Sequence, residues 1–118
     1  MATLTEPAFF VLTSLVDEPR HGYGIVGTVA DLSGGRVRLK VGTLYGVLDR
    51  LAGEGLVEPD REEVASGRLR RYYRLTEAGR GALAAEADRQ AANAQVAVAR
   101  LRAHPAVPRP SPALRLVT

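Results

Sequence analysis

The sequence predicts a mostly α-helical protein with a small β-hairpin: a winged helix-turn-helix followed by a long C-terminal helix. Three observations support this. Three helical segments come first, one hairpin follows them, and an alanine-rich helical segment comes last. This order is that of a winged helix. An α/β enzyme or a β-sandwich would be built in another order.

The first two helices are expected at residues 5–16 and 22–35. Thr5 can cap the first helix, and Pro7 is tolerated in its first turn. Residues 17–22 suggest a turn, and residues 36–39 a brief strand. In the second helix, which Gly34 and Gly35 should end, the residues expected to face inward are Ile25, Val26, Val29 and Leu32.

The third helix begins near residue 41 and ends at Gly53 or Gly55. Its apolar residues, at i, i+3, i+4 and i+7, are Leu44, Val47, Leu48 and Leu51. The opposite face carries Gly42, Gly46 and Gly53, and a glycine weakens a helix by roughly 1 kcal/mol relative to alanine. Close approach to a DNA groove or phosphate backbone would explain these glycines. A tight helix crossing is the structural alternative.

Two strand-like runs around the turn at residues 64–67 form the hairpin. Alternation along the second strand places Tyr73 and Leu75 on the core face and Arg70 on the other, with Arg68 near the tip. Arg68 and Arg70 could therefore reach DNA. The first strand is acidic, however, and its carboxylates could instead pair with the arginines across the hairpin: Glu58, Asp60, Glu62 and Glu63.

Thr76 should cap the last helix, which runs to about Ala103. Its small and apolar residues follow a heptad-like spacing, which favours a helix–helix seam over packing of a lone helix on its own domain. We expect three parts: a winged-helix domain (1–75), a dimerisation helix (76–103) and a flexible proline-rich tail (104–118). The expected dimer interface comprises Phe9, Phe10, Leu12, Ala87, Ala91, Ala94, Val98 and Leu101.

The basic middle of the chain is either a solvated face or the part that meets a polyanionic partner. The formal net charge is +3, and residues 36–74 alone hold nine basic and six acidic groups. Lys40, the only lysine, directly precedes the third helix, whose N-terminus also suits phosphate. The residues expected to contact DNA are Lys40, Thr43, Tyr45, Gly46, Arg50, Arg68 and Arg70.

The sequence gives no sign of catalysis. It has no cysteine and only two histidines, His21 and His104, with no nucleophile motif, phosphate loop or zinc spacing. We expect no enzyme activity, no cofactor and no metal site. Apolar runs of membrane-spanning length and a signal peptide are also absent, so a cytoplasmic location without membrane association is expected.

Three blocks resemble the PadR family of bacterial transcriptional regulators: "HGYGI" (21–25), "GTLYGVLDRLAGEGLV" (42–57) and "RRYYRLTEAGR" (70–80). Members of this family are dimeric winged-helix proteins, most of them repressors, and many bind a palindromic operator. The resemblance implies the same for this chain. It places Thr43 and Tyr45 on the recognition helix and makes Gly22 and Tyr23 structural. Gly46 departs from the family, which often has proline there, and Lys40 stands where a small polar cap is usual.

Relatives sense phenolic acids or planar drugs near the dimer interface, so the resemblance also implies a small aromatic effector. The chain has no tryptophan, but Phe9, Phe10 and Tyr23 could line a small pocket; packing in the core is the alternative use of these residues. We therefore expect a sequence-specific regulator, more specifically a repressor, that binds double-stranded operator DNA as a homodimer. The alternative is a winged helix used for protein–protein contact without specific DNA binding.

Overall fold

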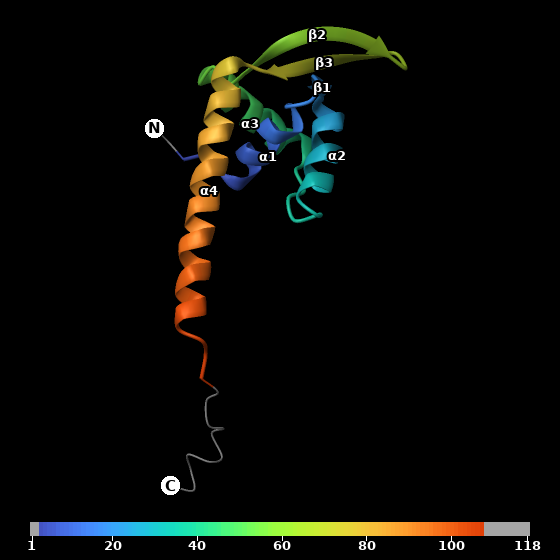
Figure 1. Ribbon diagram of the computed structural model, residues 1–118. Helices are drawn as coiled ribbons and strands as arrows, with labels where there is room; N and C mark the ends of the chain where they lie inside the picture. Colours follow the sequence, from blue (N-terminus) through green and yellow to red (C-terminus); the bar gives the residue numbers. More distant parts are fainter. Residues whose placement is uncertain (1–2, 108–118) are drawn as a thin grey trace, which may run out of the picture. The chain divides into compact units, whose positions relative to one another are not determined.

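The computed structural model describes residues 3–107 and has four helices and a three-stranded sheet (Figure 1). The predicted winged-helix class is confirmed: three helices precede a hairpin, and a long helix follows it. In chain order, the elements are α1 (Glu6–Ser14), β1 (Arg20–His21), α2 (Gly22–Leu32), α3 (Val41–Gly53), β2 (Val57–Ala65), β3 (Arg68–Leu75) and α4 (Glu77–Ala103).

The helix ends follow local capping chemistry. Thr5 caps α1 as predicted, because its Oγ1 accepts a hydrogen bond from the Ala8 N–H at 3.2 Å. After α3, Gly55 has a positive φ of 77°, and the Leu56 N–H returns to the Leu51 carbonyl at 2.9 Å. This Schellman arrangement ends α3 and directs the chain into β2.

Thr76 joins the sheet to α4. Its Oγ1 accepts from the Gly79 N–H at 2.9 Å and donates to the Gly55 carbonyl at 2.6 Å. The predicted cap is thus confirmed, and it also ties the start of α4 to the end of α3. Gly79 is buried there, and a β-carbon at this position would overlap the Leu56 carbonyl oxygen, so only glycine fits.

The core lies between the first three helices and the base of the hairpin. The apolar stripe predicted for α3 is confirmed, since Leu44, Leu48 and Leu51 are buried and Val47 packs against them. Tyr73 and Leu75 cover this core from the hairpin side. The buried apolar residues are Ala8, Val11, Leu12, Leu15, Ile25, Val29, Val37, Leu44, Leu48, Leu51 and Val57.

The sheet contains one strand that the sequence did not reveal. Its order is β1-β3-β2, and Arg20 and His21, predicted within a turn, pair with Tyr73 and Tyr72. A strand of two residues is too short to show the alternation of polar and apolar residues from which strands are predicted. The strand predicted at residues 36–39 is wrong, because Ser33 holds this segment at the end of α2: its Oγ accepts from the Val37 N–H at 2.9 Å.

Two further expectations need correction. The second helix ends at Leu32 rather than residue 35, and the Leu32 side chain is 49% exposed instead of facing inward. Leu12, expected at a dimer interface, is completely buried in the core of the protomer. Its side chain therefore has no surface to offer a second chain.

The described chain divides into two compact units between Ala87 and Asp88, a point within α4. The predicted end of the last helix at about Ala103 is confirmed. Most of the tail predicted for residues 104–118 lies outside the described residues, and the functional division into three parts stays a prediction. No helix within residues 3–107 is both long enough and apolar enough to span a membrane.

Candidate nucleic-acid interface

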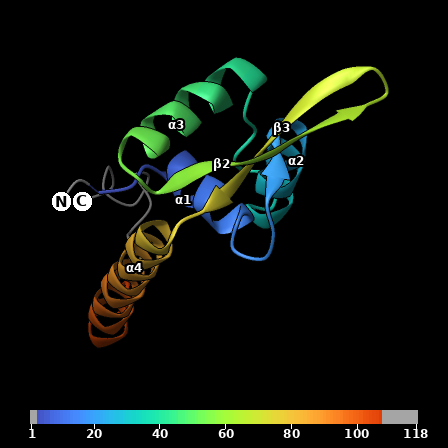
Figure 2. The ribbon, with the colours of Figure 1, turned by 90° about the horizontal axis from the view of Figure 1, so that it is seen from above.

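The α3 face opposite the core is open. Gly42, Gly46 and Gly53 are exposed, and a β-carbon at any of them would meet no atom within 4 Å in the described part of the chain. The tight-crossing alternative within one protomer therefore fails for these glycines. What remains is a helix face without side chains at these positions, which another surface can approach closely. Figure 2 shows α3 beside the hairpin.

The start of α3 combines a cation with free backbone donors. Lys40 occupies the N-cap position, is exposed, and makes no capping hydrogen bond through its side chain. The first N–H groups of a helix carry partial positive charge and suit a phosphate. Thr43 lies in this first turn and is exposed, so the two residues share one end of the open face.

Tyr45 is only partly available to a ligand. Its side chain is 39% exposed, and a β-carbon at Gly22 would lie 2.9 Å from its hydroxyl oxygen. The absence of a side chain at residue 22 thus makes room for the tyrosine. Gly22 is buried as a structural residue should be, whereas Tyr23, expected to be structural, is 64% exposed.

The arginines fall into two groups according to their ion pairs. One group is paired with nearby carboxylates: Arg20 with Asp17 and Glu18, Arg36 with Glu6, Arg61 with Asp60 and Glu63, Arg71 with Glu62, and Arg74 with Glu58 and Asp60. Within residues 3–107, no ion pair holds the basic residues predicted to contact DNA, namely Lys40, Arg50, Arg68 and Arg70.

In the part of the chain that the structure describes, the carboxylates of β2 therefore form ion pairs with Arg61, Arg71 and Arg74, and not with Arg68 or Arg70. The Arg74 guanidinium lies 2.7 Å from the Glu58 carboxylate. Its hydrogen bonds to Glu58 and Asp60 raise the pKa of Arg74. Arg70 lies opposite Glu63 in the strand register, but Glu63 bonds Arg61 at 2.7 Å, which lowers the Glu63 pKa. Neither Arg68 nor Arg70 forms an ion pair in the described chain, although the Glu63 carboxylate also attracts Arg70.

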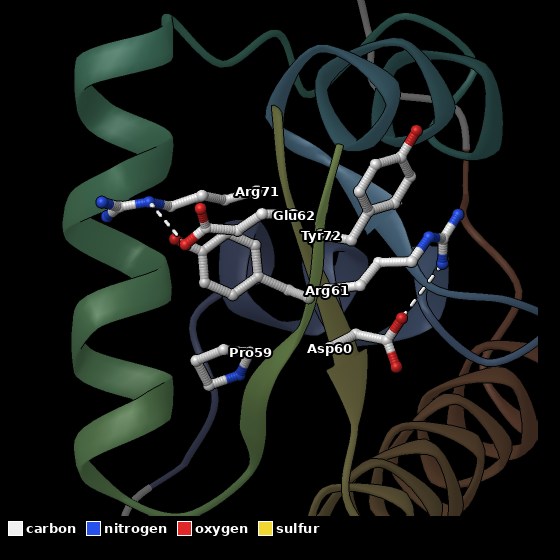
Figure 3. A pocket seen from close by; sticks show the side chains of 7 residues that line it. Pro59, Asp60, Arg61, Glu62, Arg71 and Tyr72 are labelled. Atoms are coloured by element: carbon white, nitrogen blue, oxygen red, sulfur yellow. Dashed lines mark hydrogen bonds and ion pairs between the residues drawn. The ribbon is translucent and has the colours of Figure 1, made fainter. Parts of the chain in front are cut away.

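Figure 3 shows how the middle of the hairpin divides its side chains. Pro59, Glu62 and Arg71 point toward α3, while Arg61 and Tyr72 lie on the other side of the strands. A pocket of about 280 Å³ is lined by Pro59, Asp60, Arg61, Glu62, Arg71, Tyr72 and Tyr73.

The hairpin tyrosines have structural contacts. The Arg61 guanidinium lies 3.9 Å from the centroid of the Tyr72 ring, and His21 meets the same ring edge-on. One face of Tyr72 is therefore covered and cannot take a base. Burial raises the pKa of Tyr73, whose ring packs on the core.

A second pocket, of about 370 Å³, lies where the start of α2, Tyr45 of α3 and strand β3 meet. It is lined by His21, Gly22, Tyr23, Tyr45, Arg68, Leu69, Arg70 and Arg71. The fold thus brings Tyr45 close to Arg68 and Arg70. His21 accepts a hydrogen bond from the Gly24 N–H through Nδ1 at 3.3 Å, and burial lowers its pKa.

Sequence reasoning missed several residues of this surface. Arg38, just before Lys40, is exposed and belongs to the group without ion pairs. Its position two residues ahead of the only lysine could have revealed it. Tyr23 and Leu69 line the second pocket, but only the folded chain brings α2 and β3 together.

Comparison with known proteins gives the family. The sequence profile of the PadR-like transcriptional regulators matches residues 11–85. A transcriptional regulator of Mycobacterium tuberculosis is 40% identical over 73 residues, which are 62% of this chain and 64% of the relative. An uncharacterized 37.1 kDa protein of a Streptomyces fradiae transposon is 44% identical over 81 residues, or 69% of this chain. The matched region spans about a fifth (22%) of that larger protein.

Solved structures support the same fold. A PadR family transcription regulator from Clostridium difficile superposes with a TM-score of 0.69 at 23% identity, covering 82% of this chain and 99% of the other. Bacillus subtilis PadR, solved in complex with operator DNA, superposes with a TM-score of 0.56 at 23% identity, covering 64% of this chain and 44% of the other. The fold and the matched profile together show that the chain belongs to the PadR-like family of transcriptional regulators.

Proposed function

We propose that this regulator binds a palindromic operator as a homodimer, with α3 in the major groove and the hairpin on the neighbouring backbone, and that it acts as a repressor. The observation that carries the DNA-binding proposal is the open glycine face of α3, flanked by cations without ion pairs. A groove and its phosphates complement such a face in both shape and charge.

The dimer proposal rests on α4. Ala87, Ala91, Ala94, Val98 and Leu101 are all exposed in the single chain, at the spacing of a helix–helix seam. Phe9 and Phe10 are half-buried and form an edge-to-face pair 5.4 Å apart, so they retain apolar surface for a second chain. A two-fold dimer would present its recognition helices about 34 Å apart, one turn of DNA.

Repression, and release by a small aromatic effector, follow from the resemblance to the family. Repression would result where the operator overlaps a promoter. Tyr23 and Tyr45 line the same pocket of about 370 Å³, beside the proposed DNA surface. A planar ligand held there would compete directly with DNA.

Gly46→Leu tests the open face. A β-carbon at this position meets no atom of the described chain within 4 Å, and leucine favours a helix over glycine, so stability should rise by roughly 0.5–1 kcal/mol. Operator affinity should nevertheless fall at least tenfold, because the side chain would fill the space needed by the groove. Thermal unfolding and fluorescence anisotropy on a labelled operator measure the two effects.

Gly27→Leu is the matched control. Gly27 is also an exposed helical glycine at which an added β-carbon would meet no described atom within 4 Å, but it lies on α2. This variant should gain stability and keep its operator affinity. Wild-type affinity in Gly46→Leu would contradict the assignment of the α3 face and favour a protein-interaction module.

A further inference from the structure

The tip of the hairpin carries an exposed apolar pair. Val64 and Leu69 are directly opposite each other in the strand register and are 74% and 56% exposed. Only the two-residue turn Ser66–Gly67 and one further residue pair separate them from the end of the hairpin. Two large aliphatic side chains in solvent at this point contribute nothing to the core of the protomer.

A β-bulge decides which way this pair points. The register shifts between Pro59 and Glu62, so β2 gains one residue relative to β3. Unbroken alternation from Pro59 would put Glu63 on the α3 side and Val64 on the other. The bulge reverses this, and Figure 3 shows Glu62, with Arg71 opposite, pointing toward α3. Val64, two residues beyond Glu62, shares that side.

The same alternation applies to Leu69, which lies on the face of Tyr73 and Leu75. Both of these residues pack against the core that includes α3. The apolar pair therefore extends, toward the tip, the side of the hairpin that faces the recognition helix. It is continuous with the proposed DNA surface.

The charge around the pair selects its partner. Arg68 and Arg70 flank Leu69 along β3, and neither has an ion pair within residues 3–107. Arg71, on the same side as the pair, is held by Glu62 at 3.7 Å. Alternation turns Arg68 and Arg70 to the face of β3 opposite Leu69, so the tip presents an aliphatic side and a cationic side. This combination matches a polyanion that also offers an apolar interior.

The minor groove of duplex DNA fits this description. Neighbouring strands are about 4.8 Å apart, and the minor groove is about 6 Å wide, so only the narrow end of a hairpin can enter. Proteins that use this groove combine arginines with aliphatic wedges that partly unstack a base step and bend the duplex. Ser66 and Gly67 both have positive φ, 53° and 76°, the tight turn that keeps the tip narrow.

We propose that Val64 and Leu69 form a wedge that enters the minor groove beside the site of α3 and bends the operator. This inference rests on the proposed function, because it requires the chain to bind DNA through that side. It assigns separate tasks to neighbouring residues: Arg68 and Arg70 contact phosphates, and the apolar pair deforms the base stack. The salt dependence of binding reports the phosphate contacts, and the bend of the duplex reports the apolar pair, so the two tasks can be measured separately.

The first step is to select an operator from random duplexes with the wild-type protein. If no sequence is enriched, the proposed function fails, whatever the role of the wedge. If one is enriched, the variant Val64→Thr/Leu69→Thr is compared with wild type on that duplex. Energy transfer between dyes at the duplex ends reports bending, and anisotropy at several salt concentrations reports affinity and its salt slope.

The wedge variant should bend the operator less and bind it about tenfold more weakly, as expected when two partly buried aliphatic groups are replaced by polar ones. Its salt slope should stay that of wild type, since every phosphate contact remains. Val16→Thr/Leu32→Thr is the control, because it makes the same changes at residues that are 39% and 49% exposed outside the hairpin. It should match wild type in both affinity and bend.

Four results would overturn the wedge while leaving DNA binding intact. Unchanged affinity and bend would leave the pair without a role in the complex. A reduced affinity with an unchanged bend would place the pair against sugars rather than between bases. A reduced salt slope would mean that the pair only positions the arginines. A change in oligomeric mass would assign the pair to a contact between copies of the chain.

A second measurement does not depend on a loss of binding. The chain has no tryptophan, so Leu69→Trp introduces a single fluorescent reporter at the tip. Insertion between bases should quench its emission and shift it to the blue when the operator is added. Emission that stays unchanged at saturating operator would contradict the wedge.

Discussion

At the residue scale, the protonation state of His21 affects the stability of the fold. It caps α2 by accepting from the Gly24 N–H through Nδ1, and its ring meets Tyr72 edge-on. Partial burial lowers the pKa of His21 below its ordinary value of 6.5, Arg70 lowers it further, and Glu63 acts in the opposite direction. Only the neutral form has the lone pair that the cap needs. The folded chain therefore favours the neutral imidazole.

This predicts a loss of stability in mild acid. Below about pH 6.5 the unfolded chain binds more protons at His21 than the folded chain does, so the stability conferred by the neutral form falls as pH drops toward 5. The loss should be limited to about 1 kcal/mol, a typical value for an N-cap. Denaturant unfolding between pH 8 and 5 measures it.

Two variants isolate the effect. His21→Asn keeps an acceptor at the cap but does not titrate, so its stability should change less between pH 7 and 5 than that of wild type. His104→Asn removes the only other histidine, which is exposed, and should behave like wild type. An equal acid loss in His21→Asn would assign the pH dependence to other groups.

At the element scale, the hairpin separates its arginines by partner. Arg61 and Arg74 are each held by two carboxylates, whereas Arg68 and Arg70 remain without ion pairs in the described chain. Exposed ion pairs contribute little to stability, about 0–1 kcal/mol. Their larger consequence is to decide which guanidinium groups can approach DNA without first losing a carboxylate.

The salt dependence of DNA binding checks this division. Arg68→Gln/Arg70→Gln should reduce the slope of log affinity against log salt by about 0.9 for each phosphate that is no longer neutralised. Arg61→Gln/Arg74→Gln, which removes two paired arginines from the same hairpin, should change the slope much less. Equal slopes in the two double variants would show that ion pairing in the free protein does not determine which arginines meet phosphate.

At the scale of the whole molecule, the proposed dimer depends on the exposed part of α4. Every residue of α4 from Ala87 to Ala103 is exposed in the single chain, including the proposed seam. Small seam residues allow two helices to approach closely, but they bury little area each. Phe9 and Phe10 are therefore needed to enlarge the proposed interface, since Leu12 is committed to the core.

Two valines on α4 give a matched test of the seam. Val98 lies on the proposed seam, whereas Val96 lies nearly opposite it on the helix, and both are exposed. Val98→Glu should shift the dimer toward monomer by like-charge repulsion across the two-fold axis, and Val96→Glu should leave it intact. Sedimentation at micromolar concentration distinguishes the two. A monomeric wild type, or equal behaviour of both variants, would contradict the seam.

The sequence alone was sufficient to predict the helices, the hairpin and the part of the core that α2 and α3 supply. Leu44, Leu48 and Leu51 form a stripe at helical spacing, and Thr5 and Thr76 cap helices through neighbours three residues away. These features depend on contacts within a few residues along the chain. The residue types in such a window determine them, which is why the positions of α3 and α4 could be predicted.

Only the tertiary structure decided the features that depend on distant pairing. The strand at Arg20–His21 exists because β3 supplies its partner, and the direction of Val64 depends on one extra residue in β2. Likewise, all four carboxylates of the acidic strand could have paired with Arg68 or Arg70. The register instead gave Glu62 to Arg71 and placed Glu58 and Asp60 beside Arg74, while Glu63 bonds Arg61 within its own strand. Register is set by the whole sheet, and shifting it by one residue moves every side chain to the opposite face.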